Sequence, residues 1–349
     1  MAAPPPPPTR STGLGPGARL PDFARTAADG RVLYFYEFAN GRPLLFAACG
    51  SAAGKGEVDG LIDAARALAA DIGMQAIVLC DEGAVDAASD LDVAVLVDPD
   101  PQLRDYIFGT AEGHELVMLA IADPNLRLIA RSALAASAPA ADLAAALRGA
   151  AVEALARWQA ERDALGGLAP VLLVPRVLAP DLCRRLIAGF PGWLPRDSPM
   201  PDAAQPALAV DLARKRRLDA LIGDPALEAE TVAAIAAHVV PEVAKAFCFD
   251  AVRFERLKIV CYRAGDGGHF ATHRDNTAPQ TAYRRFALTV NLNTGEYAGG
   301  TLAFPEYGEG HGYAVPAGGA IVFACTHAHR VDPVTAGERY ALISFLSGT

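Results

Sequence analysis

The 349-residue sequence predicts two folded parts, an α/β domain followed by a mainly β domain of the antiparallel barrel or jelly-roll type. Over residues 19–150, buried-strand runs alternate with stretches of helical apolar spacing, which favours an α/β arrangement. After residue 168, short β-rich runs are separated by Gly, Pro and Asn, a pattern typical of antiparallel barrels and jelly rolls. Gly166 and Gly167 end an Ala-rich helical stretch and mark the expected boundary.

The α/β domain, residues 19–150, is expected to follow a disordered proline-rich tail at 1–18. Its strands are predicted at 32–36, 43–49, 75–80, 93–97, 115–122 and 126–130, and its helices at 57–72, 101–108 and from 140. A helical connector is expected at 151–168. The six cysteines form no Cys-x-x-Cys pair and no secretory signal precedes them. Reduced thiols and a cytoplasmic location are therefore expected.

The second domain, residues 169–349, is expected to begin with a strand at 171–178 and a helix at 179–188. A longer helix is predicted at 228–247, where Pro241 should kink or split it. Three β-rich runs follow, at 285–293, 297–305 and 318–325. The helices should therefore support a β core.

The charge balance limits the partners. A formal net charge of −9 argues against nucleic acid binding, and no uninterrupted apolar run reaches membrane-spanning length. We therefore expect neither a nucleic acid nor a membrane partner. The basic run Arg214–Arg217 leaves two interpretations open, a solvated face, which is favoured, or a patch that faces substrate.

His273 and Asp275 are two residues apart in a segment expected to be extended, so their side chains should leave the same face of a strand. A distant histidine, His327 or His329, would complete a set of two imidazoles and one carboxylate. That set suits a non-haem Fe(II) centre with open positions better than a four-ligand zinc site. Arg339, on a later strand, can form a bidentate pair with a carboxylate.

The stretch from Cys261 to Tyr340 resembles the prolyl 4-hydroxylase-like family of Fe(II)/2-oxoglutarate oxygenases. A Gly-Gly-His-Phe loop precedes His-x-Asp-Asn, and an Arg-Arg-Phe-Ala strand follows it. The resemblance implies a double-stranded β-helix (jelly roll) with supporting helices and iron bound by His273, Asp275 and His329. It selects His329 over His327, because Val331-x-Pro333-Val334 and the spacing to Arg339 match the family only in that register.

The same resemblance implies that Arg339 holds the distal carboxylate of 2-oxoglutarate and that Tyr262 lines the cosubstrate, although a purely core role for Tyr262 stays open. Thr289 and Asn291 share one strand face and are predicted to line the pocket. The implied cofactors are Fe(II), 2-oxoglutarate, O2 and L-ascorbate. The implied reaction hydroxylates an unactivated C–H bond of a peptidyl proline or a small molecule and releases succinate and CO2.

The N-terminal domain resembles a thioredoxin-fold domain of the peroxiredoxin type, through Leu20-Pro-Asp-Phe at its head and Asp123-Pro-Asn near its end. Cys49 opens a loop that lacks the proline and threonine of the peroxiredoxin motif, so the domain is expected to be redox-inactive. Two alternatives remain: a thiol peroxidase that uses Cys49 and has an appended barrel, and a non-catalytic module that binds a partner. The sequence does not predict an oligomeric state.

Overall fold

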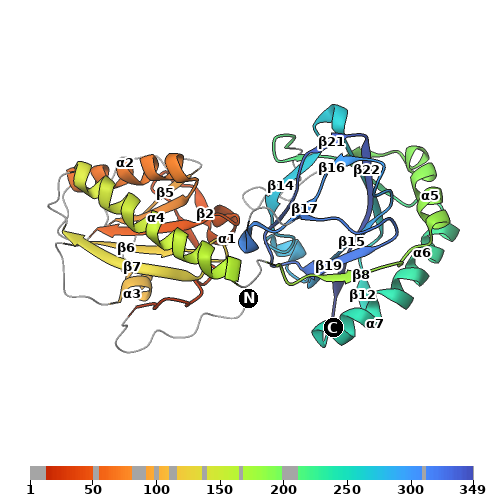
Figure 1. Cartoon of the computed structure of the whole chain (residues 1–349), viewed down its shortest axis with the longest axis horizontal. Coiled ribbons are helices and arrows are strands. Elements are labelled where there is room, and N and C mark those ends of the chain that lie inside the picture. Colours follow the sequence, from red (N-terminus) through yellow and green to blue (C-terminus); the bar gives the residue numbers. More distant parts are fainter. Residues whose placement is uncertain are drawn as a thin grey trace. The chain divides into compact units, whose positions relative to one another are not determined.

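The computed structural model describes residues 13–49, 55–80, 92–97, 102–109, 116–135, 140–164, 168–198, 211–308 and 312–348. The chain divides into two compact units, Met1–Gly167 and Leu168–Thr349. None of the described helices is both long enough and apolar enough to cross a bilayer. Figure 1 labels the helices and strands of both units.

The first unit contains a mixed five-stranded sheet in the order β5-β4-β3-β6-β7, in which β3, β4 and β5 are parallel and the other pairings antiparallel, and a two-stranded antiparallel sheet β1-β2. Its strands are β1 (Ala24–Thr26), β2 (Val32–Tyr34), β3 (Leu44–Cys49), β4 (Gln75–Cys80), β5 (Val93–Val97), β6 (Leu116–Ala122) and β7 (Leu128–Ala135). Its helices are α1 (Phe35–Ala39), α2 (Lys55–Ile72), α3 (Gln102–Phe108) and α4 (Ala140–Ala164).

Strand alternation divides the core of this unit into two layers. Alternate residues of β3, such as Leu45 and Ala47, pack with α2 and α4, whereas Leu44 and Phe46 pack with α1 and α3. Cys49 belongs to the first layer and is 3% exposed, and no described cysteine forms a disulfide. Both faces of the central strands are therefore buried, as their continuous apolar runs predict.

Two expectations for the first unit need correction. Phe35 and Tyr36 lie in α1 and not in the predicted strand at 32–36, because the Phe35 ring is fully buried and stacks on Phe23 at 4.5 Å between centroids. Residues 1–12 lie outside the described part. The inner end of the predicted tail is ordered, since the amides of Leu14 and Gly17 donate to Ile107 and Leu128 carbonyls.

The second unit contains two large antiparallel sheets, with the orders β8-β19-β15-β22-β13-β11-β9 and β10-β14-β20-β17-β18. Its strands are β8 (Leu172–Val174), β9 (Arg196–Asp197), β10 (Lys215–Arg216), β11 (Leu218–Leu221), β12 (Arg253–Phe254), β13 (Lys258–Arg263), β14 (His269–His273), β15 (Phe286–Asn291), β16 (Ala298–Gly299), β17 (Leu302–Ala303), β18 (Gly312–Tyr313), β19 (Ala320–Ala324), β20 (His329–Val331), β21 (Val334–Ala336) and β22 (Glu338–Ser347).

Two apolar clusters hold this unit together. One lies between the sheets and joins Val260, Phe270 and Phe323, which come from both of them. The other lies on the outer face of the larger sheet, where the helices α5 (Pro180–Gly189), α6 (Pro225–His238) and α7 (Val240–Phe247) cover it. Figure 1 shows these helices along one side of the second unit. The result is a β-sandwich that leaves the second sheet to carry the site.

The predicted helix at 228–247 is split, as Pro241 indicated. The α6 helix ends at His238 and α7 starts at Val240, since a proline in the first turn of α7 needs no backbone N–H there. Asp224 caps α6 by accepting the amides of Ala226 and Leu227. The expected outer support of the β core is therefore present.

Candidate metal centre

Two histidines and one aspartate meet on the smaller sheet of the second unit. His273 ends β14, His329 begins β20, and the two residues are direct cross-strand partners. The sequence had led us to expect Asp275 in the same extended strand as His273. It lies instead in the turn after β14. The ligand atoms of the three side chains lie within 4.8 Å of one another. The Asp275 carboxylate is 3.5 Å from Nε2 of His273 and 3.4 Å from Nε2 of His329.

A β-bulge shapes this end of β14. Phe270 pairs with Val331 and His273 pairs with His329, so three steps along β14 match two steps along β20. The extra residue places Phe270 and His273 on the same face, where their rings stack at 3.5 Å between centroids. An uninterrupted strand would have sent the two rings to opposite faces.

The histidines have a defined tautomer. Nδ1 of His273 lies 2.9 Å from the Ala271 carbonyl, and Nδ1 of His329 lies 3.0 Å from the His327 carbonyl. Because a carbonyl can only accept, each Nδ1 carries a hydrogen, which leaves Nε2 of the neutral ring as the ligand atom that faces the centre.

The protonation states also suit cation binding. Burial, and next the charge of His329, lower the pKa of His273 to about 4. Burial alone would raise the pKa of Asp275, but His329, His273 and Arg284 together lower it well below its usual value. The centre at neutral pH is therefore a neutral His273 beside a carboxylate, the forms that ligate a metal.

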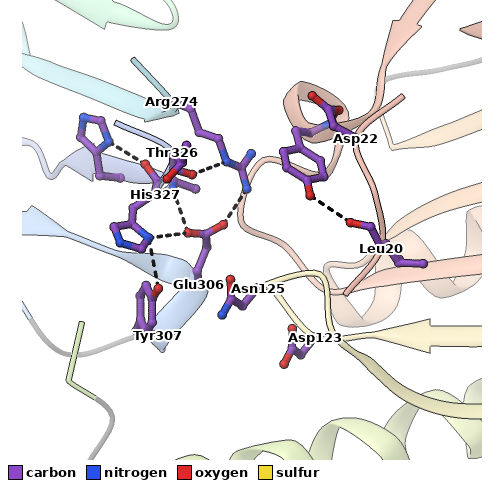
Figure 2. A network of polar contacts seen from close by, with 12 residues as sticks. Leu20, Asp22, Asp123, Asn125, Arg274, Glu306, Tyr307, Thr326 and His327 are labelled. Carbon is purple, nitrogen blue, oxygen red and sulfur yellow. Dashed lines mark hydrogen bonds and ion pairs between the residues drawn. The ribbon is translucent and has the colours of Figure 1, made fainter. Parts of the chain in front are cut away.

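A buried ion pair joins the two ligand-bearing segments (Figure 2). Arg274, between the two ligands of the first segment, donates to Glu306 at 2.6 Å and to the Thr326 carbonyl at 3.0 Å. Glu306 also accepts the Ala328 amide at 2.9 Å, one residue before His329. Its carboxylate lies 3.7 Å from His327. We call Arg274 and Glu306 the ligand clamp.

The clamp also settles where His327 lies. Its Nδ1 faces the Tyr307 hydroxyl at 3.1 Å and the Glu306 carboxylate (Figure 2), and the described cluster of ligand atoms does not include it. Of the two histidines that the sequence offered, His329 is the one beside Asp275. His327 supports the clamp instead.

Removing the charge of the clamp should be costly. In Glu306→Gln the Arg274 guanidinium stays buried without its carboxylate, which should cost about 3–5 kcal/mol of unfolding free energy. Because the clamp fixes both ligand segments, we also expect iron affinity to fall about 10–100-fold. Denaturant unfolding and metal titration measure the two effects.

The matched control is Glu230→Gln, since Glu230 pairs with Arg185 where both side chains are about half exposed, 49% and 46%. That change should lower the unfolding free energy by less than about 1 kcal/mol and leave iron affinity unchanged. Equal effects of the two substitutions on iron affinity would show that the clamp does not position the ligands.

Asp275 has further support on its other side. Its amide donates to the Cys325 carbonyl at 3.1 Å, and its carbonyl accepts Arg284 at 3.2 Å. Arg284 is itself fixed by a two-point pair with Glu255 and lies over the Phe345 ring. The backbone of Asp275 is thus held by the segments that carry Cys325 and Arg284.

Arg339 of β22 is buried, with 3% exposure, in the same unit. Its Nη2 donates to Oδ1 of Asn291 at 3.0 Å, and its guanidinium lies over the Tyr262 ring at 5.3 Å. Its buried Nε has no hydrogen-bond partner. An unsatisfied buried donor on a cation indicates a missing anionic acceptor.

Tyr262 and Asn291 both lie next to this arginine, and each is 1% exposed. The Tyr262 hydroxyl accepts Arg217 at 3.1 Å, so its own hydrogen remains available, and no acceptor for it occurs among the described residues. Thr289 is buried on the same face of β15 as Asn291. Arg339, Asn291 and Tyr262 are thus in contact, whereas Thr289 shares only the strand face of Asn291.

The basic run Arg214–Arg217 is not a solvated face, which corrects the favoured interpretation. Its residues alternate, with Arg214 and Arg216 exposed and Lys215 and Arg217 turned inward. Arg217 forms a two-point pair with Asp219, at 2.7 and 3.1 Å. Sequence reasoning also missed Asp219 and the clamp. The clamp residues Arg274 and Glu306 are related only by a tertiary contact, which no spacing rule predicts.

Two imidazoles and one carboxylate on a β-sandwich have the composition of the facial triad that non-haem iron oxygenases use. Residues 257–347 match the family model of the 2OG-Fe(II) oxygenase superfamily. The matched range contains the three residues of the centre and Arg339. This part of the second unit is therefore similar to that family.

Individual relatives are similar over part of the chain. A PKHD-type hydroxylase of Azoarcus sp. (strain BH72) is 36% identical over 89 residues, which are 24% of this chain and 39% of that protein. A PKHD-type hydroxylase of Delftia acidovorans is 29% identical over 181 residues, 49% of this chain and 75% of that protein. The chain spans less than half the length of the first relatives it matches, 39% in the Azoarcus protein.

Among solved structures, a Pseudomonas putida prolyl-4-hydroxylase is 20% identical with a TM-score of 0.42, over 54% of this chain and 98% of that one. The family match and the PKHD-type relatives together support an Fe(II)- and 2-oxoglutarate-dependent hydroxylase.

Proposed function

We propose that the second unit is an iron- and 2-oxoglutarate-dependent dioxygenase that hydroxylates an unactivated C–H bond of a small-molecule or peptide substrate. The convergence of His273, Asp275 and His329 within 4.8 Å carries this proposal. We further propose that its two sheets form a double-stranded β-helix, with the centre at the end of β14 and β20.

The donor set fits Fe(II). Two Nε2 lone pairs and one carboxylate suit this cation, and three protein ligands leave positions for a cosubstrate and dioxygen. His273, Asp275 and His329 would hold the ion. Bound there with 2-oxoglutarate and dioxygen, it supplies the oxidising chemistry, and the cosubstrate leaves as succinate and CO2.

The cosubstrate fits the unsatisfied donors. Arg339 would bind the distal carboxylate of 2-oxoglutarate through its free Nε, while Asn291 holds the guanidinium in place. Tyr262 would donate its hydroxyl hydrogen to the same ligand, because Arg217 already occupies the oxygen as a donor. Thr289 would line the same pocket wall.

Apolar rings exclude water from the centre. The Phe323 ring meets His329 edge-on at 4.6 Å between centroids, and Phe304 lies 6.1 Å from the same imidazole. With Phe270 stacked on His273, both histidines are enclosed by aromatic surface. Such enclosure keeps competing hydrolytic and redox reactions of water away from a reactive centre.

We propose that the first unit is a thioredoxin-like domain without redox activity. The burial of Cys49 at the end of β3 supports this, since reactive thiols are accessible and in electropositive surroundings. Cys49→Ser should leave peroxide turnover unchanged. Its loss in that variant would favour the thiol peroxidase alternative.

The direct test is a screen of metabolites and peptides with Fe(II), 2-oxoglutarate, O2 and L-ascorbate. We expect succinate and a product one oxygen heavier from the wild type, and neither from His273→Ala. A wild-type protein that releases no succinate or CO2 with any candidate would contradict the proposal and favour a binding module that merely retains iron.

A further inference from the structure

Lys215 is a largely buried lysine of the second unit whose described contact is with the Phe270 ring. The residue is 6% exposed, and no acceptor among the described residues forms a hydrogen bond with its amine. Lysine is almost never buried unless it is paired, because burying an unpaired charge is costly. The amine is therefore available to a ligand that comes from outside the chain.

The position of Lys215 follows from strand pairing. Lys215 of β10 lies directly opposite Phe270 of β14, so the two side chains share one face. The amine lies 4.7 Å from the centre of the Phe270 ring, and that ring stacks on His273. Lys215 thus stands on the metal side of the sheet, one aromatic ring away from a candidate iron ligand.

The nearest described carboxylate already forms hydrogen bonds with other groups. Asp219, a nearby carboxylate, accepts two bonds from Arg217 and one from Ser198 at 2.6 Å. Burial, and next the charge of Arg217, lower the pKa of Lys215 to about 6. An anion that enters from solvent would supply the missing acceptor and restore the charged form.

With Fe(II) and 2-oxoglutarate bound, the formal charges of the site balance when one further anion is present beside a protonated Lys215. Arg217 and Asp219 neutralise each other as a pair. With Fe(II) and the dianion 2-oxoglutarate bound, the carboxylate of Asp275 and the guanidinium of Arg339 complete a neutral set. Lys215 is then the cation left over, which a single carboxylate would balance.

We propose that Lys215 binds a carboxylate of the primary substrate, so that the enzyme hydroxylates a small molecule of the free amino acid class. The inference rests on the proposed oxygenase function and names the substrate chemistry of that site. An internal peptide residue other than Asp or Glu brings no carboxylate next to its reactive carbons, whereas every free amino acid does. A peptide with a free C-terminal carboxylate offers the same group and is distinguished by the test.

The test measures binding before turnover. Full-length protein is loaded with Fe(II) and 2-oxoglutarate without oxygen. Free L-amino acids, L-proline among them, dipeptides with free C-termini and the carboxamides of each are titrated by calorimetry. We expect at least one free amino acid to bind about tenfold or more tightly than its carboxamide, because the amide cannot form the charge-assisted bond. Tighter binding of the dipeptides would assign the carboxylate to a peptide terminus and overturn the amino acid class.

The matched variants are Lys215→Met, which keeps an apolar stem of similar length, and Lys245→Met on the exposed surface of α7. Only Lys215→Met should abolish the preference for carboxylate over carboxamide, while leaving 2-oxoglutarate affinity unchanged. An unchanged preference, or equal binding of neutral ligands by the wild type, overturns the proposal. So does a selective loss of 2-oxoglutarate affinity, which would assign Lys215 to the cosubstrate.

Succinate release separates this proposal from the function on which it rests. If the wild type releases succinate with a neutral substrate, the oxygenase function stands and the role of Lys215 fails. If no succinate forms although an amino acid binds through Lys215, the oxygenase function itself fails.

Discussion

His329→Ala will lose iron, whereas His327→Ala will retain it. His329 presents Nε2 to the Asp275 carboxylate, but His327 faces Tyr307 and Glu306. Losing one of three protein ligands should lower iron affinity by about 100-fold or more, since even residues around a ligand change affinity 10–100-fold. Metal analysis after dialysis and an anaerobic Fe(II) titration measure the difference.

The pair is a matched control for sequence position and residue type, because the two histidines are two residues apart. His327→Ala should weaken iron binding by about tenfold at most, through the clamp. Equal iron contents in the two variants would refute the assignment of His329 as a ligand. A loss confined to His327→Ala would move the third ligand to that residue.

Arg339→Ala should raise the 2-oxoglutarate requirement by about 30-fold or more and leave iron bound. The guanidinium is buried and its Nε is unsatisfied, so it is placed to form a desolvated pair with a carboxylate. Truncating one partner of such a pair lowers the binding free energy by about 2–5 kcal/mol. The dependence of succinate formation on 2-oxoglutarate concentration gives the change.

Two further variants test whether the effect depends on the geometry and the position of the Arg339 guanidinium. Arg339→Lys keeps the charge but loses the two-point geometry, so its requirement should lie between those of the wild type and Arg339→Ala. Arg263→Ala removes a half-exposed arginine that pairs with Glu338 and should change little. Loss of iron from Arg339→Ala would show that the residue supports the centre and not the cosubstrate.

Local patterns were sufficient to predict much of the fold. The continuous apolar runs at 44–49, 75–80 and 93–97 became β3, β4 and β5, since both faces of these strands are covered. Pro241 likewise indicated the break between α6 and α7. The error at Phe35 has a tertiary cause, because packing against Phe23 and Phe46 decides in favour of a helix where the local composition favours a strand.

The site was predictable only where its chemistry leaves a short motif. The spacing of His273 and Asp275 indicated a metal centre, and the match of the later residues to a family pattern selected His329. Glu306 could not be found in this way, because its role depends on reaching Arg274 across the unit. Lys215 was hidden by the opposite difficulty, since a run of four basic residues favours solvent until strand pairing turns every second one inward.

The bulge in β14 makes segment length more important than residue identity between Phe270 and His273. Ala271 and Thr272 should tolerate exchange for other small residues. Deleting either one would restore an even ladder and turn one of the two stacked rings away from its neighbour. Engineers who recombine this strand with homologous segments should therefore keep its residue count fixed, because a single omission would separate the candidate ligand His273 from the aromatic ring that Lys215 faces.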